Sequence, residues 1–337
     1  MLSETEYQQR LKVILSLTER RSWQPDRIEL RRCLTKETPR FVYFPLINSE
    51  GKKLFFKGAF SDKPGLLRRF QKELLIQKWL SRESNLARRI FDSGQIKNLF
   101  WYVGQYFRDN QGLICREENI SSLKPKKMIA LGHALRQLWQ IKQSDLPIKL
   151  KPYLLINKQK SVIINEVESR IREHLETLYP ALEVSDLNWL KSDGQTVILF
   201  FKKFKESFFK AKQAPGVLIH GDLAPNNVFF GTKRAVLLDW ESAYWSCLPL
   251  LDWGLDVASF YTRAWENIKL GKKLIKEVKK SKRIQDDLFD RALKIGLVLS
   301  SLQKLAPMFK GGFYRSDYDQ CHFNSLVGII RRALNQK

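Results

Sequence analysis

Residues 217–243 read VLIHGDLAPNNVFFGTKRAVLLDWESA, and this stretch decides how the rest of the chain is interpreted. Two short apolar runs, 228–230 and 235–238, flank a turn at 231–234. Apolar runs joined by a turn of this length are typical of a β-hairpin. A hairpin brings its outer ends together, so polar residues on either side of it are expected to lie close in space.

Three polar side chains stand at those outer ends. Asp222 and Asn227 precede the first strand, and Asp239 follows the second. In phosphoryl transfer, one carboxylate orients the acceptor hydroxyl and takes its proton, while an amide and a second carboxylate hold Mg²⁺ on the phosphates. The pattern therefore predicts phosphoryl transfer from a magnesium nucleotide.

The order H-x-D-x-x-x-x-N, a hydrophobic strand and D-W-E resembles the aminoglycoside phosphotransferase and choline kinase superfamily, relatives of the protein kinases. The resemblance implies that Asp222 is the catalytic base, Asn227 a metal ligand and Asp239 the principal metal ligand. It also implies that His220 braces the loop from within. Glu241 fills the third position of D-W-E, where the role differs among relatives. The alternative interpretation is a polar turn between core strands.

The segments before residue 113 favour one small sheet and its helices. Helical spacing marks residues 1–22 and 64–82, and strand-like patterns mark 27–34, 41–47, 53–60, 87–91 and 100–107. The expected fold is α+β and two-lobed, resembling the protein kinases. It has a five-stranded antiparallel N-terminal lobe with one helix (1–107), a hinge (108–112) and a larger, mostly helical C-terminal lobe (113–337).

Lys57 lies on the third predicted strand and Glu73 on the helix that follows. The resemblance implies that Lys57 contacts the α- and β-phosphates and that Glu73 holds it. It also implies that backbone groups near Gln105 and Phe107, beside the hinge, meet the edge of the purine. A surface lysine and a solvated glutamate are the alternative.

The predicted turn at 35–40, TKETPR, contains no glycine. Protein kinases bring backbone amides to the phosphates through a glycine-rich loop. We expect side chains of Thr35, Lys36 or Thr38 to take over part of that work. ATP with Mg²⁺ is the predicted donor, although the pattern does not separate ATP from GTP.

The spacing of apolar residues in the C-terminal part favours a series of helices. They are expected at 126–142, 161–179, 185–212, 285–305 and 323–334. The helical insertion at about 144–215 falls where small-molecule kinases of the superfamily build part of the acceptor pocket. The stripe of Phe200, Phe201, Phe204 and Phe208 is expected to be core.

The segment LPLLD after the D-W-E motif resembles one that supports the catalytic loop. Its proline spacing favours Asp252 for that role, with Asp256, one helical turn later, as the rival. The combined motifs are similar to members associated with bacterial surface-glycan synthesis, which points to a sugar or glycan acceptor. Asp317 and Asp319, in a glycine-aromatic loop, are further candidates for binding hydroxyls.

The composition of the chain indicates which binding partners and which cellular compartment to expect. The 337 residues carry a formal net charge of +24, which attracts anions such as nucleotides, glycan phosphates and membrane surfaces. Neither a zinc-finger spacing nor an RNA-binding motif favours nucleic acid. Cys33, Cys115, Cys247 and Cys321 lie far apart, which predicts free thiols in a reducing compartment. The chain has no signal-peptide pattern and no long apolar run, so a cytoplasmic protein is expected.

Residues 269–283 hold eight Lys or Arg and one acid, with leucines and a valine at every fourth position. This predicts an amphipathic helix with a basic face, either solvated or docked on an anionic membrane. The leading prediction is an ATP-dependent phosphotransferase acting on a hydroxyl of a small molecule, sugar or glycan. The alternatives are a catalytically inactive nucleotide-binding scaffold and a membrane-surface kinase of a lipid-linked acceptor. The sequence leaves the oligomeric state open.

Overall fold

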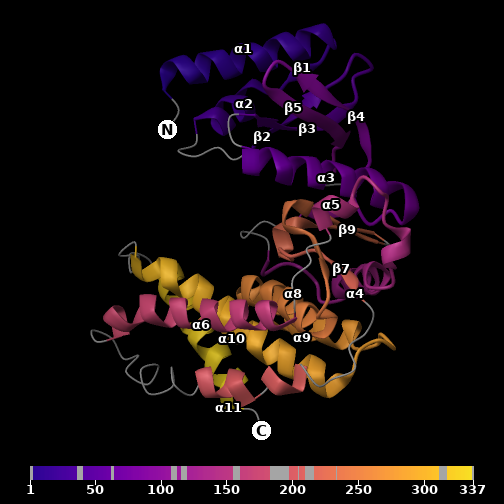
Figure 1. Ribbon diagram of the computed structural model, residues 1–337. Helices are drawn as coiled ribbons and strands as arrows, with labels where there is room; N and C mark the ends of the chain where they lie inside the picture. Colours follow the sequence, from indigo (N-terminus) through magenta and orange to yellow (C-terminus); the bar gives the residue numbers. More distant parts are fainter. Residues whose placement is uncertain are drawn as a thin grey trace. The chain divides into compact units, whose positions relative to one another are not determined.

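The chain forms two compact units in a computed structural model (Figure 1). The first comprises Met1–Leu113, Pro147–Leu154 and Val236–Ser242, and the second comprises Ile114–Leu146, Leu155–Ala235 and Ala243–Lys337. The structure describes residues 3–35, 41–61, 64–107, 112–114, 120–154, 160–182, 197–203, 205–208, 216–232, 234–310 and 317–335.

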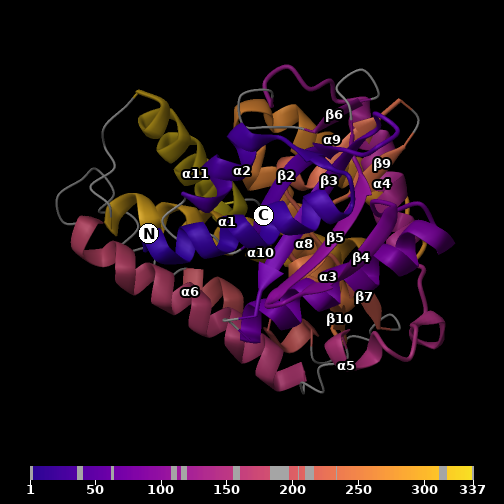
Figure 2. The same ribbon diagram turned by 90° about the horizontal axis from the view of Figure 1, so that it is seen from above.

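The first unit is built on a five-stranded antiparallel sheet in the order β1-β2-β3-β5-β4, whose strands run side by side in Figure 2. Helices α1 and α2 cover one face, and α3 covers the other, where it contacts the short helix α5. The elements are α1 (Glu4–Arg20), β1 (Gln24–Pro25), α2 (Arg27–Leu34), β2 (Val42–Ile47), β3 (Lys53–Phe60), α3 (Pro64–Glu83), β4 (Ile90–Ile96), β5 (Leu99–Gln105) and α5 (Lys151–Leu154).

Strand β3 supplies both faces of this sheet because successive side chains of a strand point in opposite directions. Leu54 and Phe56 pack with the residues of α1 and α2. Phe55 and Ala59 pack on the side of α3. Lys57, midway between them, is therefore carried on the α3 face.

The strand predicted at residues 27–34 is wrong, because this segment is the helix α2. The Asp26 side chain caps it by accepting hydrogen bonds from two backbone N–H groups of the first turn, both at 3.1 Å. Leu30, Cys33 and Leu34 are buried, and their spacing of three and four residues is helical. The fifth strand of the sheet is instead the two-residue β1.

The segment before β4 also differs from its prediction, since the fourth strand begins at Ile90 and not at residue 87. Ala87 instead forms a parallel bridge with Leu237, whose N–H donates to the carbonyl of Leu86 at 2.8 Å. This contact ties the stretch that leads to Asp239 into the first unit.

The second unit is mostly helical, and α10 packs against α6, α8 and α11. Its elements are β6 (Gly112–Ile114, at the boundary), α4 (Lys127–Leu138), α6 (Lys160–Leu182), β7 (Val217–Ile219), β8 (Val228–Gly231), β9 (Ala235–Leu237, at the boundary, with Val236 and Leu237 in the first unit), β10 (Tyr244–Ser246), α8 (Pro249–Arg263), α9 (Ile268–Val278), α10 (Asp286–Lys310) and α11 (Asp317–Asn335). Strands β7 and β10 pair antiparallel. The predicted hairpin is present, since β8 and β9 are neighbours and Gly231 N–H donates to the Arg234 carbonyl at 2.9 Å.

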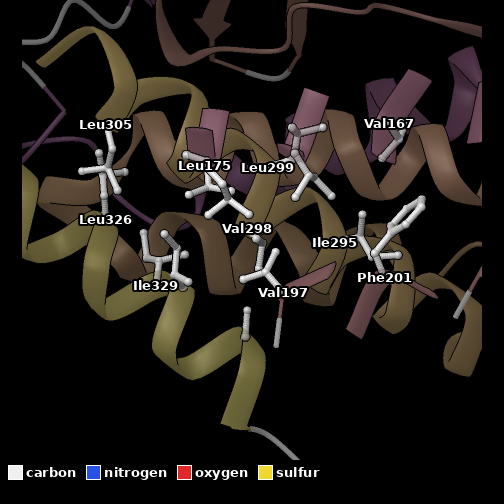
Figure 3. Close-up of a cluster of buried hydrophobic side chains, with 14 of the residues drawn as sticks. Val167, Leu175, Val197, Phe201, Ile295, Val298, Leu299, Leu305, Leu326 and Ile329 are labelled. Atoms are coloured by element: carbon white, nitrogen blue, oxygen red, sulfur yellow. The ribbon is translucent and has the colours of Figure 1, made fainter. Parts of the chain in front are cut away.

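A hydrophobic cluster joins α6, α8, α10 and α11 of this unit, and Figure 3 shows side chains from several of these helices pointing toward one another. Phe201 and Phe208, from the helical residues 197–203 and 205–208, are buried in it. The interpretation of the phenylalanine stripe as core is correct for these two residues. Phe204 and the predicted helix start near residue 185 lie outside the described residues.

Three smaller findings complete the fold. None of the helices in the described ranges is long and apolar enough to cross a membrane. No disulfide joins Cys33, Cys247 and Cys321, whereas Cys115 is outside the described part of the chain. The predicted hinge also falls outside it, apart from its last residue, Gly112, which begins β6.

Helices α8 and α10 approach so closely that their crossing needs glycine. A Cβ atom on Gly254 would lie 2.5 Å from the carbonyl carbon of Ala292, and one on Gly296 would lie 2.9 Å from the carbonyl oxygen of Gly254. Backbone atoms cannot swing aside as a long side chain can, so an added methyl group would force the helices apart.

We expect Gly254→Ala to lower the free energy of unfolding by about 1–3 kcal/mol, the usual cost of overpacking a core. The matched control is Gly328→Ala in α11, where a Cβ would meet nothing closer than 3.5 Å. That change should stabilise the protein by roughly 0.5–1 kcal/mol through helix propensity. Urea unfolding measures both, and an unchanged midpoint for Gly254→Ala would contradict the close crossing.

Candidate active site

The first unit holds a buried lysine between two carboxylates. Lys57 on β3 is 6% exposed, and its Nζ lies 2.6 Å from Glu73 Oε2 on α3 and 3.1 Å from Asp239 Oδ1. Its ammonium group also stands 4.4 Å from the centroid of the Phe41 ring. The structure therefore brings together Lys57 and Glu73, which the resemblance had paired, and adds Asp239.

Further hydrogen bonds fix the buried glutamate. Tyr102 Oη donates to Glu73 Oε1 at 2.9 Å, and Gln77 Nε2 donates to the same oxygen at 2.8 Å and to Tyr102 Oη at 2.9 Å. Burial alone would lower the pKa of Lys57, but the negative charges of Glu73 and Asp239 outweigh it and raise that pKa. Lys57 is therefore a cation held at a fixed position on the sheet.

The backbone conformation of Asp239 is unusual and sets the direction of its side chain. Its φ is +59°, in the left-handed region that aspartate and asparagine enter more readily than most residues. The next residue, Trp240, is fully buried, and its Nε1 donates to the Leu237 carbonyl at 3.0 Å. The Asp239 side chain remains 37% exposed, so it meets Lys57 while part of it faces solvent.

The resemblance implies a bound Mg²⁺ ion, and the side chains near Lys57 have to suit this ion. In the described ranges, no three or more His, Cys, Asp or Glu side chains gather into a metal-binding group. Mg²⁺ is commonly bound by one or two carboxylates together with substrate phosphates, rather than by a protein cage. A partly exposed carboxylate at Asp239 fits that mode of binding.

The second unit holds the other candidate group, in the loop between β7 and β8. Asn227 Nδ2 donates to the carbonyl oxygen of Asp222 at 2.9 Å and to its Oδ2 at 3.0 Å. The Asp222 N–H donates to Nδ1 of the buried His220 at 3.3 Å, and the bracing role of this histidine stays a prediction. On its other oxygen, Asp222 forms an ion pair with Arg263 at 2.7 Å.

Sequence reasoning missed Arg263, the last residue of α8. No motif marks it, because its pairing with Asp222 depends on how α8 packs beside the loop. Since Asp239 belongs to the first unit and Asp222 and Asn227 to the second, the convergence of the three side chains stays a prediction.

The loop is supported by Asp256 and not by the preferred candidate, Asp252. Asp256 is buried and accepts hydrogen bonds from the N–H groups of His220 at 3.2 Å and Gly221 at 3.1 Å. Burial raises the pKa of Asp256 to about 7, and these backbone donors oppose the rise. Asp252, one turn earlier, instead accepts a short hydrogen bond from the Ser246 hydroxyl.

The remaining candidates of the first unit lie as follows. Gln105 ends β5, and its N–H donates to the Arg89 carbonyl at 2.8 Å. Phe107 is buried. Glu241 lies in the short 3₁₀ turn after Asp239. Burial and the positive charge of Arg69 lower the pKa of Lys72 to about 8, and the negative charge of Glu241 opposes this change.

Two other expectations shift or lie partly outside the described part of the chain. Thr35 caps the end of α2 through a hydrogen bond from its hydroxyl to the Arg31 carbonyl at 3.0 Å, and Lys36 and Thr38 are not among the described residues. Asp317 and Asp319 fall in the first turn of α11 and not in a loop.

The predicted basic helix forms as α9, and its apolar side belongs to the core. Leu270, Leu274 and Val278 are completely buried. Buried Glu277 is paired with Lys273 at 2.9 Å and Lys280 at 2.6 Å. The leucines and the valine are therefore unavailable for insertion into a membrane, and docking through the lysines stays a prediction.

Comparison with known structures finds the same fold in three kinases. A choline/ethanolamine kinase family protein from Mesorhizobium loti is 12% identical, with 87% of this chain and 88% of that one covered and a TM-score of 0.53. Choline kinase LicA from Streptococcus pneumoniae is 14% identical, with 94% and 97% covered and a TM-score of 0.51. Aminoglycoside phosphotransferase APH(4)-Ia, in a ternary complex with ADP and hygromycin B, is 11% identical, with 95% and 98% covered and a TM-score of 0.53.

These similarities, with the five-stranded sheet and the helical remainder, confirm the predicted α+β protein-kinase-like fold. A comparison with curated proteins gave no significant match. Residues 53–269, more than half of the chain, match the model of the phosphotransferase enzyme family. The chain therefore belongs to the phosphotransferase enzyme family and is a kinase whose acceptor is a hydroxyl group.

Proposed function

We propose that this protein transfers the γ-phosphate of a magnesium nucleoside triphosphate to a hydroxyl of a small molecule, sugar or glycan. The observation that carries the proposal is the Lys57 ammonium held between Glu73 and Asp239. A fixed cation beside a partly exposed carboxylate suits a triphosphate and its metal ion. ATP is the donor that the resemblance predicts.

In this proposal the first unit provides the phosphate-binding group. Lys57 contacts phosphate oxygens as a point charge, and the ion pair with Glu73 holds the Lys57 side chain in one position. Asp239, with the amide oxygen of Asn227, would hold Mg²⁺, which when bound neutralises phosphate charge. Such catalysis is mostly positioning and electrostatic stabilisation.

The second unit provides the base. Asp222 receives a hydrogen bond from Asn227 and forms an ion pair with Arg263, and together these contacts fix the orientation of its carboxylate. A carboxylate oriented in this way aligns the acceptor hydroxyl. The hydroxyl proton moves to Asp222 as the oxygen attacks the γ-phosphorus, and the nucleoside diphosphate leaves.

The acceptor class rests on analogy and on the motifs of the chain. Two of the similar proteins are named for choline or ethanolamine, and the third is an aminoglycoside phosphotransferase in complex with hygromycin B. All three compounds carry hydroxyl groups. The surface-glycan resemblance of the motifs favours a sugar or glycan for this chain. A screen of sugars, glycan fragments, amino alcohols and aminoglycosides, read by transfer of labelled γ-phosphate, identifies the acceptor. If the wild-type protein consumes no nucleotide with any acceptor, it is the inactive scaffold.

We expect Asp222→Asn to retain nucleotide binding but to lower turnover by about 10²–10⁴, the usual span for the loss of a general base. The control is Asp287→Asn, which removes an exposed carboxylate of α10. Steady-state kinetics and nucleotide calorimetry separate the two effects. Full turnover in Asp222→Asn would remove this residue from the chemistry.

Asp239→Ala should weaken nucleotide binding by at least about tenfold in magnesium buffer, which corresponds to about 1.4 kcal/mol. Because the lost ligand would act through the metal, the variant and the wild type should differ much less in EDTA. A thermal shift with the nucleotide, with and without Mg²⁺, measures this. A magnesium-dependent shift that survives the substitution would refute the metal role.

Asp256→Ala leaves the buried N–H of His220 and the partly buried N–H of Gly221 without their acceptor, so the free energy of unfolding should fall by about 1–3 kcal/mol. Turnover should fall too, because the donors belong to the loop that carries Asp222. Asp256→Asn retains one acceptor oxygen and should lose less of both. Urea unfolding and turnover measurements on both variants test whether Asp256 supports the loop. If Asp256→Ala and Asp256→Asn have equal stability and equal turnover, this role is contradicted.

A further inference from the structure

The first unit buries an arginine whose guanidinium group is not fully paired. Arg88 is 6% exposed, and its Nη1 has no hydrogen-bond partner among the described residues. Burial lowers the pKa of Arg88, against the attraction of the negative charges at Glu73 and Asp239. A buried donor without an acceptor costs free energy, so the position favours a ligand that supplies acceptors.

Aromatic rings hold this guanidinium in place. Its central carbon lies 3.6 Å from the centroid of the Phe55 ring and 5.5 Å from that of Phe107. A guanidinium group stacks face to face on aromatic rings, which leaves its N–H donors pointing outward in its own plane. The contact with Phe55 therefore holds the Arg88 guanidinium beside strand β3.

Gly104 makes room for the arginine. This residue pairs with Phe55 across β3 and β5. A Cβ atom on Gly104 would lie 3.0 Å from Arg88 Cδ and 2.9 Å from the Arg89 carbonyl oxygen. A larger residue here would displace the Arg88 side chain, so the glycine and the arginine belong to one arrangement.

The place of Arg88 matches the base end of a nucleotide whose phosphates meet Lys57. Phe55 and Lys57 lie on the same face of β3, two residues and therefore about 7 Å apart. Phe107, whose ring centroid lies 5.5 Å from the Arg88 guanidinium, ends the segment where the resemblance placed the purine edge. A base extending from Lys57 along this face reaches the aromatic rings that hold Arg88.

The guanidinium group of Arg88 can distinguish guanine from adenine by its hydrogen bonds. A guanidinium group only donates hydrogen bonds. Guanine offers two acceptors on one edge, O6 and N7, and arginine pairs with both, whereas adenine replaces O6 with an amino group that also donates. Arg88 therefore complements guanine and meets a like donor on adenine.

We propose that Arg88 recognises the base of the nucleotide donor and selects a 6-oxopurine, so that the enzyme prefers GTP to ATP. This inference rests on the proposed function, since it concerns the nucleotide of that same site. It replaces ATP, the donor implied by family resemblance, with one chosen from the side chains present.

The first test uses the wild-type protein with the magnesium complexes of GTP, ITP and ATP. Calorimetry should show GTP binding about tenfold or more tighter than ATP, the discrimination typical of a bidentate arginine–guanine pair. ITP keeps O6 and N7 but lacks the 2-amino group, so it should bind nearly as well as GTP. Equal or tighter binding of ATP would overturn the inference, and binding of none of the three would overturn the proposed function with it.

The second test changes the arginine. Arg88→Gln carries both a donor and an acceptor and can pair with adenine N6 and N7, so the preference should shift toward ATP by about tenfold. Arg89→Gln is the matched control, because Arg89 is the exposed neighbour and loses the same charge. Arg88→Met keeps a long stem on Phe55 and tests for a purely structural role. A GTP preference that survives in Arg88→Met would contradict base recognition by this residue.

Discussion

The buried ion pair between Lys57 and Glu73 is the interaction on which the rest of the site depends. A charge pair inside a protein is stable only when its remaining hydrogen-bonding capacity is satisfied. Tyr102 and Gln77 donate hydrogen bonds to the glutamate, and Asp239 forms a second ion pair with the lysine at 3.1 Å. The pair therefore fixes a cation at one position on the sheet, and the positions proposed for the phosphates, the metal and the nucleobase all depend on it.

The loop of the second unit is organised by a similar device. A buried carboxylate, Asp256, accepts the backbone N–H groups that precede Asp222, while Asn227 and Arg263 orient the Asp222 side chain. In each unit a buried acidic residue holds a neighbouring group in place: Glu73 holds Lys57, and Asp256 holds the loop backbone that precedes Asp222. Positioning of this kind is what phosphoryl transfer asks of a protein, since little covalent chemistry falls to its side chains.

The sequence predicts those parts of the site whose residues lie on consecutive elements of the chain. Lys57 and Glu73 were found because a strand and the following helix present them in a recognisable order. Arg88 was not found, because it stands beside Arg89 and only packing decides which of the two is buried. The choice between Asp252 and Asp256 failed for a related reason, since both lie on α8 one turn apart and the packing of the helix selects one.

The central claim is that the phosphates of the nucleotide meet Lys57. The most direct measurement uses a nucleotide analogue with a reactive acyl phosphate, which acylates the lysine nearest to its phosphates, followed by peptide mapping of the wild-type protein. Modification should concentrate on Lys57 and be suppressed by an excess of unmodified magnesium nucleotide. Labelling spread over surface lysines, with Lys57 unmodified and no protection by nucleotide, would contradict the account.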